Sequence, residues 1–95
     1  MDRLTETEIA EHLDRDAPAW TREGDSIVRD AKLSDFAAAI EVVDAVARIA
    51  EEANHHPDIL VHGWNNVRLT LSTHSAGGLT AADFALARQL DALLP

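Results

Sequence analysis

The stretch that decides the fold is ILVHGWNNVRLTLST, residues 59–73 of the 95-residue chain. In its second half Val67, Leu69 and Leu71 alternate with polar residues, which is the pattern of a strand with one buried face. Residues 59–62 supply a partner strand, and the four residues after them contain the turn. We therefore expect a β-hairpin here, with one apolar face and one polar face.

A second hairpin is expected earlier in the chain, over residues 19–33. The dipeptide Gly24-Asp25 is a turn signal between two short segments of mixed polarity. Trp20 and Ile27 are the expected core residues of this hairpin. Together the two hairpins predict four strands joined in antiparallel pairs.

Capping patterns predict one helix before the first hairpin and another after the second. Thr5 followed by Glu8, and Thr80 followed by Asp83, each place an N-cap hydroxyl three residues before an acidic side chain, which is the capping-box pattern. Pro18 ends the first of these helices. We expect leucines to form the apolar face of the last helix, namely Leu86, Leu90, Leu93 and Leu94.

The longest helix is expected over residues 35–53, with Ser34 as its N-cap and Asn54 as its terminator. Apolar residues recur there at spacings of four and three, which predicts one buried face. The predicted face consists of Phe36, Ile40, Val43, Ala47 and Ala50.

The order helix, strand pair, helix, strand pair, helix predicts an α+β fold. Hairpins, unlike crossover connections, build an antiparallel sheet whose helices lie on one face. We expect a single domain over residues 1–95, a two-layer sandwich of four antiparallel strands and three helices. The length of the chain is that of one domain.

Charge and composition exclude several classes of partner. The chain has 8 basic and 17 acidic side chains, a formal net charge of −9, and no cysteine. Fourteen of the acids and six of the bases lie in residues 1–54. Because the cations are not clustered, we expect no nucleic-acid partner and no membrane-surface partner. The sequence has no apolar run of about 20 residues and no signal-peptide pattern, so we expect a cytoplasmic protein.

Three histidines are candidates for chemistry: His55 and His56, at the end of the longest helix, and His74. We expect His74 to end the polar face of the fourth strand, just before a Gly-Gly turn. Imidazoles titrate near neutral pH, so one ring can donate a proton while another accepts one, which favours metal-free acid–base chemistry. A three-histidine zinc site is a weaker alternative because the spacing matches no metal motif. In the simplest alternative, these histidines only close a helix and a strand.

Three segments carry a resemblance to a known family. They are Ala-Glu-Glu-Ala-Asn-His-His-Pro-Asp at residues 50–58, Trp-Asn-Asn-Val at 64–67, and Leu-Ser-Thr-His-Ser-Ala-Gly-Gly-Leu-Thr at 71–80, followed by Asp83. With these segments the chain resembles the pterin-4a-carbinolamine dehydratase family, also known as the dimerisation cofactor of a hepatocyte transcription factor. The resemblance covers essentially the whole chain and is strongest over residues 50–91.

The resemblance implies the α+β fold just described and a reaction. The reaction is dehydration of 4a-hydroxytetrahydrobiopterin, or a related pterin carbinolamine, to quinonoid dihydropterin, which recycles the cofactor of aromatic amino acid hydroxylases. It needs no cofactor and no metal. The implied partners are the pterin substrate, further copies of the chain in a homodimer or homotetramer, and, through a functional link, a pterin-dependent hydroxylase. By position, the active-site histidines of the family fall on His55, His56 and His74.

The resemblance also implies residues that support catalysis or bind substrate. Glu51 and Asp83 would each orient an imidazole, and the full supporting set is Glu51, Pro57, Thr73 and Asp83. The hairpin turn around His62-Gly63 is one residue longer than in the family, which makes His62 a poor catalytic candidate. The alternative function is a non-catalytic oligomerising or binding module of the same fold that stabilises a protein partner.

Overall fold

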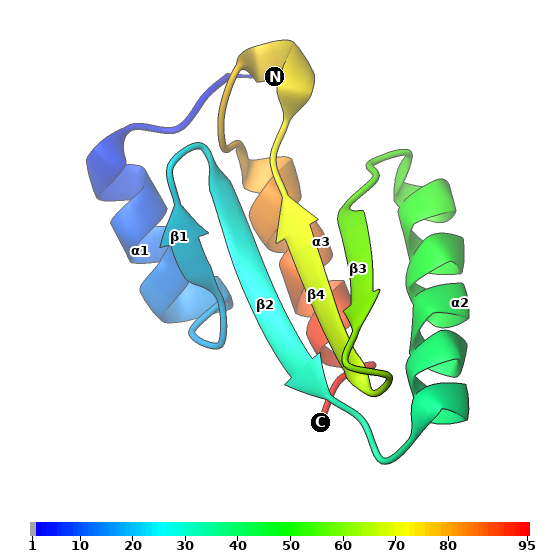
Figure 1. Ribbon diagram of the computed structural model, residues 1–95. Coiled ribbons are helices and arrows are strands. Elements are labelled where there is room, and N and C mark those ends of the chain that lie inside the picture. The colour runs from blue at the N-terminus through cyan, green and yellow to red at the C-terminus, as the bar shows by residue number, and fades with distance from the viewer. Residues whose placement is uncertain (1) are drawn as a thin grey trace.

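Four antiparallel strands form a single sheet in the computed structural model, which describes residues 2–95 (Figure 1). The order of the strands across the sheet is β1-β2-β4-β3. The elements in chain order are α1 (Glu6–Asp16), β1 (Thr21–Glu23), β2 (Ser26–Lys32), α2 (Phe36–Ala53), β3 (Asp58–His62), β4 (Asn66–Leu71), the short 3₁₀ turn η1 (His74–Ala76) and α3 (Ala81–Asp91). Both predicted hairpins and the predicted α+β class are confirmed.

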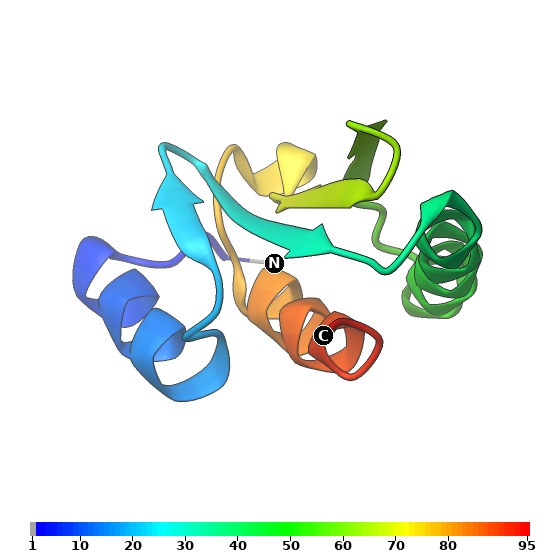
Figure 2. The ribbon, with the colours of Figure 1, turned by 60° about the horizontal axis from the view of Figure 1, so that its bottom comes forward.

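The alternation along β4 decides which face of the sheet is buried. Leu69 lies opposite Arg29 of β2 on one side and Ile59 of β3 on the other. Val67, Leu69 and Leu71 are almost completely buried, whereas the residues between them remain partly exposed. This is the side of the sheet that the helices cover, as the view along the sheet shows (Figure 2).

The core lies between this face and α3. Phe84, Leu86 and Leu90 of α3 are buried against the apolar face of the sheet. Trp20 and Ile27, the residues predicted to anchor the first hairpin, are buried in the same cluster. The side chain of Trp20 also donates from Nε1 to a carboxylate oxygen of Asp91 at 2.8 Å, so its polar atom has a partner.

The two predicted capping boxes are present. The Thr5 hydroxyl accepts from the backbone N–H of Glu8, and the Glu8 carboxylate accepts from the N–H of Thr5. At the start of α3, Thr80 and Asp83 make the same reciprocal pair. Each box satisfies backbone donors that have no partner within the helix.

The predicted N-cap of the longest helix is wrong. Its N-cap is Asp35, whose carboxylate accepts from the N–H of Ala38 at 2.7 Å, and not Ser34. A side chain at position 34 is one residue too far from the first turn to make this bond. The predicted terminator is confirmed, because Asn54 ends α2 in the left-handed conformation with φ 49°.

The buried face of α2 also differs from the prediction. Ala39, Val46 and Ala50 are the buried residues, and of the predicted face only Ala50 belongs to them. Phe36 is 56% exposed and Ile40 38% exposed. Val46 belongs to the core cluster, and Val42, Val43 and Ile49 pack partly buried against it, whereas Phe36 and Ile40 lie outward. α2 therefore carries apolar residues on more than one side.

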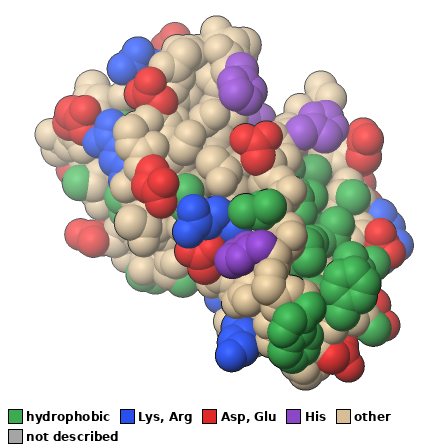
Figure 3. All heavy atoms as spheres, in the orientation of Figure 1, with side chains coloured by type: hydrophobic (Ala, Val, Ile, Leu, Met, Phe, Trp, Pro, Cys, Tyr) green, Lys and Arg blue, Asp and Glu red, His purple; other side chains and the backbone are tan. Residues whose placement is uncertain are grey.

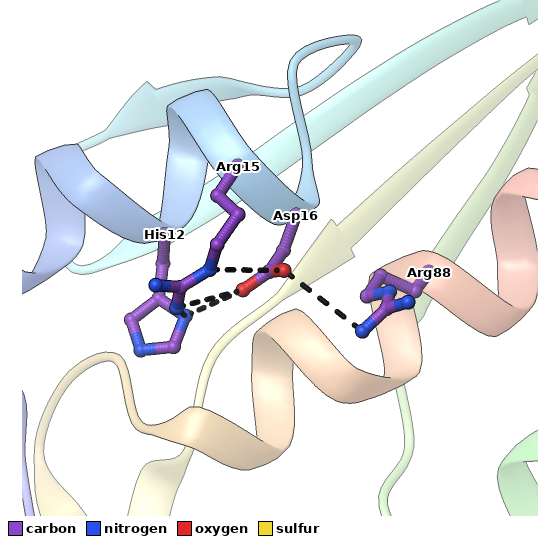
Figure 4. Close-up of polar contacts among 4 residues, drawn as sticks. All are labelled: His12, Arg15, Asp16 and Arg88. Atoms are coloured by element: carbon purple, nitrogen blue, oxygen red, sulfur yellow. Dashed lines mark hydrogen bonds and ion pairs between the residues drawn. The ribbon is translucent and has the colours of Figure 1, made fainter.

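Helices α1 and α3 are joined by a polar cluster around Asp16 (Figure 4). Asp16 contacts Nδ1 of His12 at 2.8 Å, and Arg15 and Arg88 also approach its carboxylate. The His12 ring stacks on Phe84 with 4.9 Å between ring centroids. Hydrogen bonds from His12 and Arg15 lower the pKa of Asp16.

In residues 2–95 no helix is both long enough and apolar enough to cross a membrane.

Candidate active site

The end of α2 delivers the first two candidate histidines. The left-handed turn at Asn54 reverses the chain, and the N–H of His55 bonds to the carbonyl oxygen of Ala50 at 3.1 Å. Pro57 then forces an extended approach to β3. His55 is left half-buried beside the start of α3, whereas His56 is exposed.

His55 contacts a completely buried carboxylate. Its Nε2 atom lies 2.6 Å from Oδ1 of Asp83, which belongs to the first turn of α3 and has no exposed surface. The two residues are 28 positions apart in the sequence, so the fold and not local spacing brings them together. A carboxylate hydrogen-bonded to one imidazole nitrogen orients the ring and selects its tautomer.

The second oxygen of Asp83 is held by two threonines. Oδ2 accepts from the backbone N–H of Thr80 at 2.9 Å and from Oγ1 of Thr73 at 2.9 Å. The two threonine hydroxyls also contact each other at 2.9 Å. Thr73 and Thr80 are both buried, so this network is shielded from solvent. It fixes the position of the carboxylate against which His55 rests.

His56 pairs with the other acidic residue of the predicted set. Its Nε2 atom lies 3.5 Å from Oε2 of Glu51, which precedes it on the last turn of α2. The side chains of both residues are more than half exposed. Exposed polar contacts of this kind contribute little to stability because water and salt screen them.

His74 does not lie on a strand, contrary to the prediction. β4 ends at Leu71, and His74 is the exposed first residue of η1. The loop leaves the sheet because Thr73 and Gly78 bridge backbone to backbone, while Gly77 closes the turn with φ 70°. A residue with a Cβ rarely adopts this conformation, so the glycine has a structural reason.

The three histidines come to the same end of the molecule. Thr73, the neighbour of His74, bonds to Asp83, which in turn contacts His55. Figure 3 shows histidine side chains over η1 and over the connection between α2 and β3, the two segments that carry these residues. His62 lies at the opposite end of β3, where it pairs with Asn66 next to the hairpin turn.

Residues 2–95 enclose no pocket around these side chains. The same residues contain no group of three histidine or acidic side chains placed to hold a metal ion. Metal analysis of the purified protein is the measurement that bears on the three-histidine zinc alternative.

Comparison with known families gives independent evidence on what kind of protein the chain is. The family described as pterin 4 alpha carbinolamine dehydratase matches residues 2–93. The chain belongs to this family. A protein of Nocardia farcinica, provisionally named a pterin-4-alpha-carbinolamine dehydratase, is 54% identical over 90 residues, which are 95% of this chain and 93% of that protein. A protein of Chloroflexus aurantiacus with the same provisional name is 52% identical over 94 residues, 99% of each chain.

Two solved structures place the dehydratase fold in a wider context. A transcriptional coactivator/pterin dehydratase from Brucella melitensis has a TM-score of 0.90 and 34% identity, covering 99% of this chain and all of that one. A pterin dehydratase-like protein identified as a RuBisCO assembly factor in the alpha-carboxysome has a TM-score of 0.66 and 28% identity, covering 79% and 88%. The second of these two proteins is thus described as an assembly factor.

Sequence reasoning missed Thr80 as part of the site. It was predicted only as the N-cap of α3, yet it contacts both Thr73 and Asp83. The capping box itself contained the signal, because the acidic side chain of a capping box reaches back to the N-cap residue. This places the carboxylate of Asp83 at Thr80.

Proposed function

We propose that the chain is a 4a-hydroxytetrahydrobiopterin dehydratase, an enzyme that removes water from a pterin 4a-carbinolamine by metal-free acid–base catalysis. The observation that carries this proposal is the contact between His55 and the buried Asp83, in a chain of the dehydratase family. A histidine oriented by a buried carboxylate at one ring nitrogen keeps its other nitrogen for a substrate, which is the arrangement that acid–base catalysis uses.

The reaction requires two proton transfers and no electron transfer. A proton is delivered to the hydroxyl group on C4a of the pterin, the C4a–O bond breaks, and water leaves. The proton on N5 is removed, and the C4a–N5 double bond of quinonoid dihydropterin forms. We assign these transfers to His55, His56 and His74, with Asp83 and Glu51 orienting His55 and His56. Pro57 and Thr73 complete the proposed supporting set.

Stopped-flow measurement with freshly generated 4a-hydroxytetrahydropterin tests the activity. We expect the wild-type protein to accelerate dehydration over buffer, and His55→Ala and His74→Ala each to lower kcat by about 10²-fold or more, the scale of acid–base catalysis. His62→Ala is the matched control, because His62 is also a histidine but lies at the far end of β3 from the candidate site. No acceleration by the wild type, or an unchanged rate after replacement of all three site histidines, contradicts the proposal.

The biological role that follows is recycling of the cofactor of aromatic amino acid hydroxylases in the cytoplasm. A pterin-dependent hydroxylase supplied with limiting pterin cofactor should sustain faster turnover when this protein is added together with a reductase for quinonoid dihydropterin. A hydroxylase rate that the protein leaves unchanged contradicts this role without contradicting the chemistry.

A second proposal concerns further copies of the chain. An apolar surface lies over α2 and the β3–β4 hairpin (Figure 3), and its exposed residues are Phe36, Ile40, Ile59, Leu60 and Trp64. β3 is also an edge strand, paired with β4 alone. Exposed apolar patches and unpaired edges are typical of association surfaces. We propose that this surface joins copies of the chain into a homodimer or homotetramer.

Light scattering on a sizing column tests this association. We expect the wild type to elute as a dimer or tetramer, and Phe36→Glu combined with Trp64→Glu to elute as a monomer. Ala10→Glu is the control, because Ala10 is exposed on α1, away from the apolar surface. A monomeric wild type at about 100 μM contradicts the proposal.

Association without acceleration of dehydration favours the alternative function, a binding module that stabilises a protein partner. The similar protein of the alpha-carboxysome is described as an assembly factor.

A further inference from the structure

The His55 ring has one nitrogen bound to the protein and one free. Nε2 contacts Asp83, whereas Nδ1 has no hydrogen-bond partner among residues 2–95. In the same residues, every fully buried side-chain nitrogen or oxygen has a hydrogen-bond partner. A side-chain nitrogen without a partner is therefore not fully buried. Nδ1 of His55 therefore retains some exposed surface, and the protonation of the two nitrogens decides which of them can accept a proton.

The direction of the hydrogen bonds around Asp83 follows from the number of protons available. The backbone N–H of Thr80 can only donate, and it donates to Oδ2 of Asp83. Thr73 also donates its single hydroxyl proton to Oδ2. The contact between the two hydroxyls is then donated by Thr80, whose oxygen accepts from the N–H of Ala82. A hydroxyl has one proton, so this is the one arrangement in which each contact has a donor.

With Oδ2 occupied by two donors, Oδ1 of Asp83 is the atom that faces His55. As an ionised carboxylate oxygen it can only accept, so Nε2 of His55 must carry a proton. The reverse arrangement, in which Oδ1 of Asp83 donates to Nε2 of His55, requires a proton on Oδ1. The backbone N–H of Thr80 and the hydroxyl of Thr73 both donate to this side chain, as donors do to a carboxylate, and we take Oδ1 as the acceptor towards His55.

We infer that Thr73 and Thr80 are positioning residues that, through Asp83, hold His55 as its Nε2–H tautomer and leave Nδ1 as the proton-accepting atom offered to the substrate. The tautomer stands on the contacts of the protein alone. The role of Nδ1 towards the substrate rests on the proposed dehydratase function.

The tautomer can be read directly by nitrogen NMR of the full chain. Long-range proton–nitrogen spectra of protein carrying ¹⁵N-histidine distinguish a protonated from an unprotonated ring nitrogen, and the spectrum of His55→Gln identifies the His55 signals by their loss. We expect a protonated Nε2 and an unprotonated Nδ1 above neutral pH. A protonated Nδ1 in the wild type overturns the inference.

Asp83→Asn provides a sharper test because the network predicts a reversal. The two donors on the Oδ2 side will select the amide oxygen, so the amide NH₂ must face Nε2. Nε2 then accepts, and the proton moves to Nδ1. Asn retains a short polar side chain that can serve at the helix N-terminus. A folded Asp83→Asn protein whose His55 tautomer is unchanged overturns the inference.

Thr73→Val and Thr73→Ser separate positioning from packing. Valine fills the space of threonine without donating to Asp83, so the carboxylate is held less firmly against His55. We then expect the Nδ1–H tautomer to appear in the fraction of molecules that lose this contact, and kcat to fall about tenfold. Serine restores the donor and should restore both. Equal spectra and rates for the two variants overturn the part assigned to Thr73. Thr80→Val, compared with Thr80→Ser, tests the second threonine by the same two readings.

The outcomes also distinguish this inference from the proposed function. If the tautomer reverses in Asp83→Asn but the wild type does not accelerate dehydration, the proposed function falls while the positioning of His55 stands. If dehydration is accelerated and the tautomer is as expected, Asp83→Asn should lower kcat by about 10²-fold or more, because its His55 presents the wrong nitrogen. An active Asp83→Asn enzyme with a reversed tautomer overturns the role of Nδ1.

Discussion

At the scale of single residues, the two oxygens of Asp83 serve different ends. Oδ2 caps α3 and binds Thr73, while Oδ1 contacts His55. Asp83 is fully buried. If its side chain were removed, each of these partners would lose a hydrogen bond, and no water would replace it. The same side chain therefore contributes to stability and to the candidate site, and substitutions have to be chosen to separate the two.

Asp83→Ala should lower the free energy of unfolding by at least about 2 kcal/mol, because it removes a cap and leaves buried donors unpaired. Glu51→Ala should change it by no more than about 0.5 kcal/mol, since the pair of Glu51 with His56 is exposed. Urea denaturation followed by circular dichroism measures both. Equal losses in the two variants would mean that the hydrogen bonds of Asp83 add nothing to stability.

At the scale of elements, the start of α2 is decided by one side chain. The carboxylate of Asp35 accepts from the N–H of Ala38, while Ser34 lies outside the helix. Asp35→Ala should therefore destabilise the protein by about 1 kcal/mol, the usual cost of losing an N-cap. Ser34→Ala should leave the unfolding midpoint in urea within experimental error. The opposite ranking of these two variants would contradict the cap assignment.

Elements whose signals are local could be predicted from the sequence, and elements set by distant contacts could not. The capping boxes at Thr5 and Thr80 depend on four consecutive residues each, and both are present. The side of α2 that faces the sheet depends on α3 and β4, and the apolar residues of α2 lie on more than one side. The spacing of apolar residues alone therefore predicted Phe36 and Ile40 to be buried, and both are exposed.

The candidate site divides in the same way. His55, His56 and His74 were found from residue type and resemblance, and the capping pattern already placed the carboxylate of Asp83 at the start of the last helix. The pairing of His55 with Asp83 joins residues 28 positions apart and needed the fold. The position of His74 in η1 could not be predicted because β4 ends at Leu71, before Thr73 bonds to the distant Asp83.

At the scale of the whole molecule, acid–base pairs connect elements across the surface. Asp30 of β2 binds Arg68 of β4 through two hydrogen bonds of 2.8 and 3.1 Å. Glu6 of α1 binds Arg22 of β1, and Asp16 links α1 to α3. Hydrogen bonds from Arg22 and Arg68 lower the pKa of Glu6 and Asp30. The pKa of Asp16 is lowered by His12 and Arg15, which lie on the same helix. These pairs bring fixed positive charges to acidic residues in a chain of net charge −9.

Their contribution to stability should depend on pH in one direction. A carboxylate whose pKa is lowered by folding stabilises the protein fully above its unfolded pKa and loses this contribution as the pH falls through its folded pKa. Protonation also relieves repulsion among the many acids, so the stability of the wild type mixes two opposing effects. Comparison with Asp30→Asn cancels most of the second effect, because both proteins share the other carboxylates.

We therefore expect Asp30→Asn to be less stable than the wild type at pH 7, where the hydrogen bonds from Arg68 hold the pKa of Asp30 below its ordinary value. The difference in the free energy of unfolding should shrink as the pH falls below about 4, the unfolded pKa of an aspartate, because the wild-type carboxylate then gains a proton and also becomes neutral. Urea denaturation between pH 7 and pH 3 measures this difference. Since Asp30 and Arg68 are both well exposed, added salt at pH 7 should also reduce it. A difference that persists unchanged at pH 3 would show that Asp30 acts through packing and not through its charge.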